Sequence, residues 1–159
     1  MTRLSRVLYC SRSQIPGGSE VILANIESIL AASRENNRRA GISGALLFSD
    51  GCFAQVLEGD LDAVDEAFER IQCDERHRDV TVLESGPIAA RDFPSWSMAF
   101  AGAEAARSPI AGIAVFDSAS SPSAKGRELM ALLKDVVVRE THWLPTARRD
   151  AGEARPGVD

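Results

Sequence analysis

The sequence predicts an α+β fold of the ferredoxin-like type, a sandwich whose five-stranded mixed sheet carries two helices on one face. Three observations lead to this prediction. Short apolar runs alternate with two longer stretches in which apolar residues recur every three or four positions, as on an amphipathic helix. These patterns follow one another in the order βαββαββ over residues 3–101. Helices interleaved with an antiparallel or mixed sheet in this order are typical of a two-layer sandwich.

The first strand is expected over residues 3–11, and a loop with Pro16 separates it from the first helix. Ser19 is the expected N-cap, because a serine hydroxyl can accept a hydrogen bond from a free N–H group of the first helical turn. The apolar residues that follow it lie on one helical face. This helix is expected to end near residues 35–37, before Gly41.

Two apolar runs, 42–48 and 52–58, are separated by Ser49, Asp50 and Gly51. An Asp-Gly pair between two such runs is a strong signal for a β-hairpin. The runs are therefore expected to be the second and third strands, paired antiparallel.

A second helix is expected to begin at Gly59 and Asp60, with an inner stripe made by Val64, Ala67, Phe68 and Ile71. A fourth strand is expected over 79–83, ended by Gly86 and Pro87, and a fifth over 96–100. Beyond them, residues 118–123 resemble a Ser/Pro-rich linker and residues 128–137 an amphipathic helix. The expected organisation is a domain over 1–101, a C-terminal helical extension that caps the fold over 102–147, and a disordered tail over 148–159.

The composition is that of an ordinary globular protein and excludes several classes of function. The 159 residues carry a net charge of −5, which argues against direct binding to nucleic acid or to an anionic membrane. No apolar run approaches the roughly 20 residues of a membrane span, and no signal peptide is visible at the N-terminus. Three cysteines without CxxC spacing and two distant histidines predict no metal site. We expect a cytoplasmic protein.

Tyr9 and Gln55 are the candidate functional residues, because each is polar within an apolar strand. In a strand of period two, Gln55 shares one face with Phe53 and Leu57. A buried carboxamide without partners costs about 1–3 kcal/mol. Partners from the backbone or from water would satisfy Gln55 without any function. In the predicted topology the first and third strands are central neighbours, which places Tyr9 beside Gln55 and over the helical layer.

Asn36 and Asn37 bring two further amides to the same groove, from the end of the first helix. Amide and phenol groups in an otherwise apolar slot provide directional donors and acceptors. Such a slot suits a flat heterocycle with polar edges.

Five segments at fitting spacings carry a resemblance to a known family. The sequence resembles a BLUF domain, the blue-light sensor that uses FAD, and is similar to the short, single-domain members of that family. The matching segments are Leu-Tyr-x-Ser at 8–11, Asn-Asn-x-x-x-Gly-Ile-x-Gly at 36–44, Phe-x-Gln-x-Leu-Glu-Gly at 53–59, Asp-x-Arg-His-Arg at 74–78 and Phe-Pro-x-Trp-Ser-Met at 93–98.

The resemblance implies that FAD lies non-covalently between the two helices, with its isoalloxazine ring against Tyr9 and Gln55. It implies that Asn37 bonds the C4 carbonyl and N3 edge of the ring, and Asn36 the C2 side. Arg70 is then expected to reach the C2 carbonyl or the ribityl chain. The remaining residues implied to contact the cofactor are Ile29, Ser33, Phe53, Leu57, Ile71, Asp74, His77 and Met98. FMN or riboflavin can substitute, since they carry the same ring.

The implied mechanism is a light-driven rearrangement of hydrogen bonds. Tyr9 is the nearest oxidisable side chain, and Gln55 bridges it to the flavin, so that transfer and return of an electron and a proton leave the Gln55 amide rotated or tautomerised. Sequence alone does not choose between these two outcomes. Within the family, Trp96 and Met98 carry the change outward; from alternation alone these two side chains would simply be part of a core stripe.

Three hypotheses for the function follow. The first is a blue-light sensor without enzymatic activity, which signals to a separate protein effector or through a change of homo-oligomer. The second is a small enzyme of the acyl-phosphate hydrolase type, which would need a basic loop after the first strand. Residues 14–18 contain no basic residue, although Arg12 just precedes them. The third is a ligand-binding or dimerisation module without photochemistry.

Overall fold

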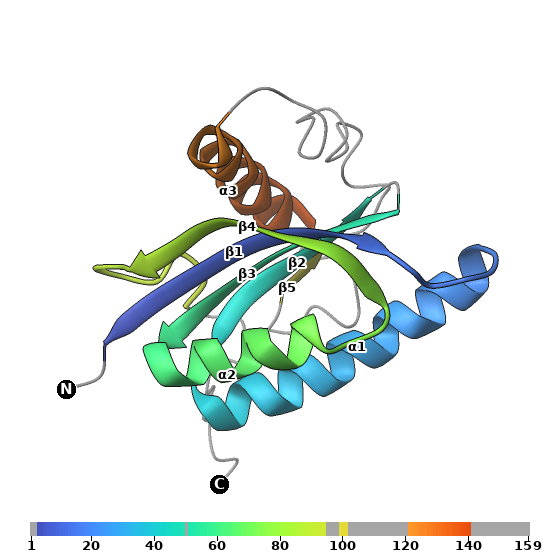
Figure 1. The fold of residues 1–159 in the computed structure, drawn as a ribbon, viewed down its shortest axis with the longest axis horizontal. Coiled ribbons are helices and arrows are strands. Elements are labelled where there is room, and N and C mark those ends of the chain that lie inside the picture. Colours follow the sequence, from blue (N-terminus) through green and yellow to red (C-terminus); the bar gives the residue numbers. More distant parts are fainter. Residues whose placement is uncertain (1–2, 50, 95–98, 102–120, 141–159) are drawn as a thin grey trace, which may run out of the picture.

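The computed structural model describes residues 3–49, 51–94, 99–101 and 121–140 (Figure 1). The sequence predictions for Asp50, for Trp96 and Met98, for residues 118–120 and for the tail 148–159 lie outside these residues. The elements in chain order are β1 (Leu4–Ser13), α1 (Ser19–Ala40), β2 (Ser43–Ser49), β3 (Cys52–Asp60), α2 (Leu61–Gln72), β4 (His77–Pro87), β5 (Ala99–Ala101) and α3 (Pro122–Glu140).

The strands form one sheet with the order β4-β1-β3-β2-β5. The first four strands pair antiparallel, and the short β5 pairs parallel with β2. β1 and β3 are neighbours at the centre of the sheet, and their register sets Tyr9 directly opposite Gln55. The predicted α+β class and the predicted adjacency of these two residues are confirmed.

Helices cover both faces of the sheet (Figure 1). α1 and α2 lie on one face and α3 on the other. Successive residues of a strand point to opposite faces, so β1 divides its side chains between two cores. Val7 and Tyr9 pack toward α1 and α2, whereas Leu8 and Cys10 pack toward α3. We call the cluster between the sheet and helices α1 and α2 the inner core, and the cluster between the sheet and α3 the outer core.

The predicted limits of α1 were wrong at both ends. Ser19 is the first helical residue, and Gly18 in extended conformation is the N-cap, without a side-chain cap. The helix runs on to Ala40, because Arg38 and Arg39 are good helix formers. It stops at Gly41, whose left-handed φ of 69° suits glycine and lets its N–H bond back to the last turn.

Other boundaries also differ from the prediction. β1 extends to Ser13 and β4 begins at His77, because these two residues pair with each other at the ends of their strands. α3 begins at Pro122, inside the segment that had been interpreted as a linker. The Ser121 hydroxyl accepts a hydrogen bond from the Ala124 N–H at 3.3 Å, and proline is favoured at the first helical position. The Ser-Pro pair is therefore a helix start.

Candidate functional site

Tyr9 and Gln55 form a hydrogen-bonded pair in the inner core. The Tyr9 hydroxyl donates to the Oε1 atom of Gln55. Both side chains are buried, with exposed fractions of 0% and 4%. Burial raises the pKa of Tyr9 above its ordinary value, and the negative charge of Asp74 raises it further. The phenol is therefore neutral at physiological pH and able to donate.

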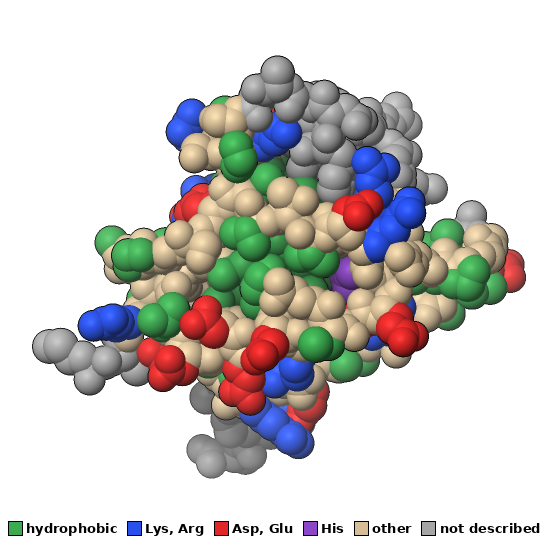
Figure 2. Space-filling model, viewed as in Figure 1, with side chains coloured by type: hydrophobic (Ala, Val, Ile, Leu, Met, Phe, Trp, Pro, Cys, Tyr) green, Lys and Arg blue, Asp and Glu red, His purple; other side chains and the backbone are tan. Residues whose placement is uncertain are grey.

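A cavity of about 180 Å³ opens beside this pair, between α1, α2 and the inner face of the sheet. Figure 2 shows apolar side chains filling the space between the sheet and α2, with charged side chains along the outer side of that helix. The residues that line the cavity are Ile29, Ala32, Ser33, Asn36, Asn37, Leu46, Gln55, Ala67, Arg70, Ile71, Asp74, Arg76 and His77.

α1 supplies the polar wall of the cavity. Ile29, Ser33 and Asn37 follow one another at intervals of four residues, which aligns them on one face of the helix. Asn37 is buried, with an exposed fraction of 3%, and the exposed Asn36 lies beside it. One amide therefore lies inside the cavity and the other at its rim.

The segment after α2 supplies charge at the rim. The Arg76 guanidinium donates to both carboxylate oxygens of Asp74, at 2.9 Å from Nε to Oδ1 and 2.7 Å from Nη2 to Oδ2. These bonds hold the pKa of Asp74 below its usual value, although its partial burial opposes them. Asp74 is therefore ionised, and the positive charge of Arg76 balances its negative charge.

His77 lines the cavity and also contacts residues of β1 and β3. Its Nδ1 atom lies 2.8 Å from the Ser11 hydroxyl, and its ring centre lies 4.6 Å from that of Phe53. Burial lowers the pKa of His77 below the usual value, against the attraction of Asp74. The imidazole is therefore neutral at pH 7.

The structure brings most of the predicted site residues together. Nine of them line the cavity: Ile29, Ser33, Asn36, Asn37, Gln55, Arg70, Ile71, Asp74 and His77. Tyr9, Phe53 and Leu57 lie in the inner core next to it. Met98, like the relay residue Trp96, is outside the described residues.

Four lining residues were missed, and each had a signal in the sequence. Ala32 precedes Asn36 by one helical turn, and Ala67 belongs to the predicted inner stripe of α2. Leu46 lies directly opposite Gln55 in the register of β2 with β3. Arg76 stands inside the Asp-x-Arg-His-Arg segment, between two residues that were selected.

Two further properties bear on the class of protein. None of the helices in the described part of the chain combines the length and the apolar character that a membrane span requires. The described residues also contain no cluster of three or more histidine, cysteine, aspartate or glutamate side chains able to hold a metal ion.

Comparison with known proteins agrees with the site. The family model described as "BLUF: Sensors of blue-light using FAD" matches residues 4–99. Among curated relatives, photoactivated adenylate cyclase subunit beta of Euglena gracilis is 34% identical over 104 residues, which is 65% of this chain and 12% of the relative. The alpha subunit from the same organism is 35% identical over 98 residues, 61% of this chain and 9% of the relative. The chain thus spans a small fraction of these cyclase subunits.

Solved structures agree in fold over most of the chain. The dark-state structure of BlrB, a BLUF protein, is 32% identical with a TM-score of 0.66, and the match covers 88% of this chain and 98% of that one. The BlsA ground state is 26% identical with a TM-score of 0.67, over 85% of this chain and 88% of that one. With its cavity, its Tyr9–Gln55 pair and the family match over residues 4–99, this chain belongs to the BLUF family of blue-light sensors.

Proposed function

We propose that this blue-light sensor binds FAD in the cavity between α1 and α2, and that light rearranges the hydrogen bond between Tyr9 and Gln55. The observation that carries the proposal is this buried hydrogen bond, whose Gln55 amide is part of the cavity wall. A buried carboxamide that bonds a phenol on one side and borders a cavity on the other can couple the hydrogen bonding of the phenol to that of a ligand in the cavity.

Polar side chains around the cavity match the polar edge of a flavin ring. Asn37 suits the C4 carbonyl and N3 edge, because it is buried and its amide both donates and accepts. Asn36 and Arg70, which are exposed at the rim, suit the C2 side and the ribityl chain. Asp74 and His77 lie at the more open end. Ile29 and Ile71 belong to the apolar wall of the cavity, and Phe53 and Leu57 support that wall from the inner core.

The size of the cavity supports enclosure of one end of the cofactor. Pockets for whole drug-sized ligands are roughly 300–1,000 Å³, whereas this one is about 180 Å³. The ring end of FAD would therefore lie inside and the adenine end outside. FMN and riboflavin carry the same ring, so the enclosed contacts would accept them as well.

Tyr9 and Gln55 supply the photochemistry. A flavin excited by blue light is a strong oxidant. With the ring bound, Tyr9 would give one electron to it and its phenolic proton to the bonded Gln55 carbonyl, the proton acceptor within reach. Both return to Tyr9, and the Gln55 amide is left rotated or tautomerised. In the new arrangement Gln55 would donate a hydrogen bond toward the ring edge, which would shift the absorption to longer wavelength without a covalent bond to the protein.

The signal leaves through the opposite side of the sheet. We propose that the strand expected over 96–100 completes β5 as a fifth strand of the sandwich, with Trp96 and Met98 as the relay. α3 lies on the outer face and contacts β5, β4 and β2. The family match over residues 4–99 is to a sensor domain, which supports light sensing, and not catalysis, as the role of this part of the chain. Its output is contact with a separate cytoplasmic effector, or a change of homo-oligomer, without direct binding to nucleic acid or membrane.

An absorption spectrum of the purified protein tests this function. We expect a flavin spectrum in the dark that moves to longer wavelength under blue light and returns afterwards. Extraction of the cofactor, followed by chromatography, distinguishes FAD from FMN and riboflavin. A colourless protein, or a flavin spectrum that light does not move reversibly, would contradict the proposal.

A further inference from the structure

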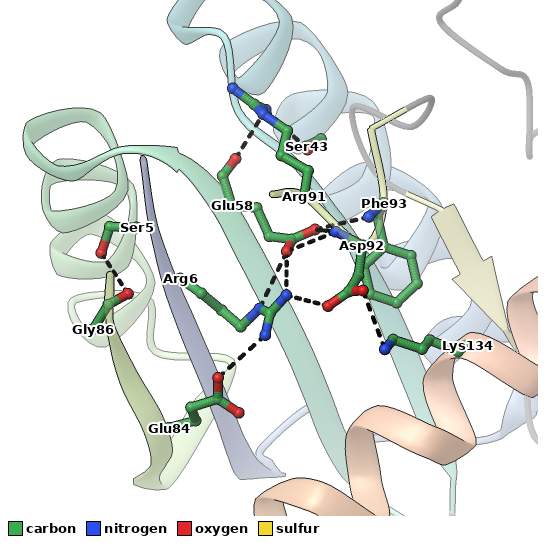
Figure 3. A network of polar contacts seen from close by, with 10 residues as sticks. All are labelled: Ser5, Arg6, Ser43, Glu58, Glu84, Gly86, Arg91, Asp92, Phe93 and Lys134. Carbon is green, nitrogen blue, oxygen red and sulfur yellow. Dashed lines mark hydrogen bonds and ion pairs between the residues drawn. The ribbon is translucent and has the colours of Figure 1, made fainter. Parts of the chain in front are cut away.

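A buried ion pair connects β1 and β3 on the face of the sheet opposite the cavity (Figure 3). The Arg6 guanidinium donates to the Glu58 Oε2 atom through Nη2 at 2.7 Å and through Nε at 3.1 Å. Glu58 is fully buried, and the Arg6 side chain is 10% exposed. Glu58 lies three residues after Gln55 on the same strand, but on the other face. A displacement of β3 therefore reaches both the cavity and this ion pair.

Glu58 also holds the segment that leads toward the fifth strand. Its carboxylate accepts the backbone N–H of Asp92 at 3.0 Å and that of Phe93 at 2.8 Å. Arg91 adds donors to the carbonyl oxygens of Gly41, at 2.7 Å, and of Glu58, at 3.1 Å. Residues 91–93 are thus fixed to the central strand that carries Gln55.

The same segment contacts α3. One carboxylate oxygen of Asp92, Oδ2, pairs with Arg6, and the other, Oδ1, lies 3.1 Å from the Nζ atom of Lys134 in α3. Next to it, Phe93 packs in the outer core with Leu129 and Leu133 of that helix. Asp92 is therefore shared between the sheet and α3.

The two contacts of Asp92 differ in strength. Arg6 is 10% exposed and is held in place by Glu58, which also accepts the Asp92 backbone N–H, so the contact between Arg6 and Asp92 joins two groups that are both fixed to β3. Lys134 and Asp92 are 51% and 32% exposed, and an ion pair in contact with water contributes little and is screened by salt. A small displacement of residues 91–93 would leave the contact between Asp92 and Arg6 intact and would separate Asp92 from Lys134.

We propose that Asp92 is the point at which movement on the flavin side of the sheet is passed to α3, through a Lys134 ion pair that forms in the dark and opens in the light. The inference rests on the function proposed above and adds the contact that changes. Glu58 is the positioning residue that keeps Asp92 attached to β3. The pair biases α3 between two arrangements, and light shifts the balance by separating the charges.

Hydrogen exchange of residues 122–140 in the flavin-loaded protein, in the dark and under blue light, tests the proposal. We compare the wild type with Lys134→Gln and with Arg127→Gln, which removes one positive charge from another exposed position of the same helix. The expected result for Lys134→Gln is faster exchange in the dark and a difference between light and dark reduced by about twofold or more. Arg127→Gln is expected to retain the wild-type difference.

Salt provides a second measurement on the wild type. At about 1 M salt the screening length falls to roughly 3 Å, and exchange of α3 in the dark should rise toward its value in the light. The red shift of the flavin is recorded for every sample and should be the same in all of them. A lost red shift in the wild type would count against the proposed function itself. A normal red shift together with a wild-type light–dark difference in Lys134→Gln would overturn the role of the ion pair alone.

Discussion

At the scale of single residues, the proposed function depends on one hydrogen bond between two buried side chains. Tyr9 is the single tyrosine of the sequence, so no other phenol can take its place. Its pKa is raised by burial, so in the proposed photochemistry it is a neutral donor. The hydrogen bond to Gln55 points the phenolic proton toward the acceptor that the proposed mechanism requires.

We predict that Gln55→Leu retains the fold and the flavin but loses the light-induced red shift. Leucine is similar in size and suits the apolar face on which Phe53 and Leu57 lie, whereas it has no amide to rearrange. Gln72→Leu makes the same change at an exposed position at the end of α2 and should keep the shift. Absorption spectra before and after blue light measure both. A normal red shift in Gln55→Leu would eliminate the mechanism.

We predict that Tyr9→Phe binds flavin but forms no ordinary signalling state. The substitution removes one hydroxyl and costs about 1–3 kcal/mol of stability, because Gln55 loses a buried donor. It also removes the nearest group that can release an electron and a proton, so flavin fluorescence should last longer. Time-resolved fluorescence and the yield of the red-shifted state are the measurements. Formation of that state with wild-type yield would show that Tyr9 is not the donor.

At the scale of elements, the close approach of β2 to β3 positions the wall of the cavity. Gly44 lies opposite Leu57 in this pairing, and an added Cβ would meet the Val56 carbonyl oxygen at 2.0 Å. No side chain fits there without a shift of the backbone. Leu46, two residues further along β2, lies opposite Gln55 and lines the cavity.

We therefore predict that Gly44→Ala destabilises the protein by about 1–3 kcal/mol, the usual cost of overpacking, and weakens flavin binding. Gly18→Ala is the control, because its added Cβ has nothing within 4 Å and its φ is −81°; replacing glycine at an N-cap should cost less than about 1 kcal/mol. Denaturant unfolding and flavin titration measure the two effects. Equal stability of the two variants would show that the strands can separate without cost.

At the scale of the whole molecule, α3 is a structural layer. Its residues Leu129, Met130 and Leu133 complete the outer core over Leu8 and Leu47 of the sheet. Without this helix, an apolar sheet face would be open to water. An exposed face of that kind favours association.

A chain that ends at Ala101 is therefore predicted to self-associate. The cavity lies on the other face of the sheet, so flavin binding and the red shift should persist in the soluble fraction. Light scattering and size-exclusion chromatography, compared with the full chain at equal concentration, give the oligomeric state. A monomeric truncated chain as stable as the full one would mean that α3 contributes no cover to the sheet.

Much of this architecture and site could be predicted from local patterns. Alternation placed Gln55 on the inner face, and the position of Asn36 and Asn37 at the end of the first helix placed both amides at the groove, where both line the cavity. The end of α1 and the start of α3 were mistaken, because stretches with Asn or Ser-Pro are common in both helix ends and loops. Arg76 was missed because its contribution depends on a bond to Asp74 that turns both toward the cavity rim.

The sequence by itself determined the order of the elements, the two faces of β1 and β3, and the family to which the chain belongs, because each of these follows from neighbouring residues or a fixed spacing. Only the tertiary structure decided which ion pairs form among Arg6, Glu58, Asp92 and Lys134. They come from β1, β3, the segment after β4, and α3. A buried ion pair depends on the distance between side chains far apart in the chain, and that distance is set when the layers pack together.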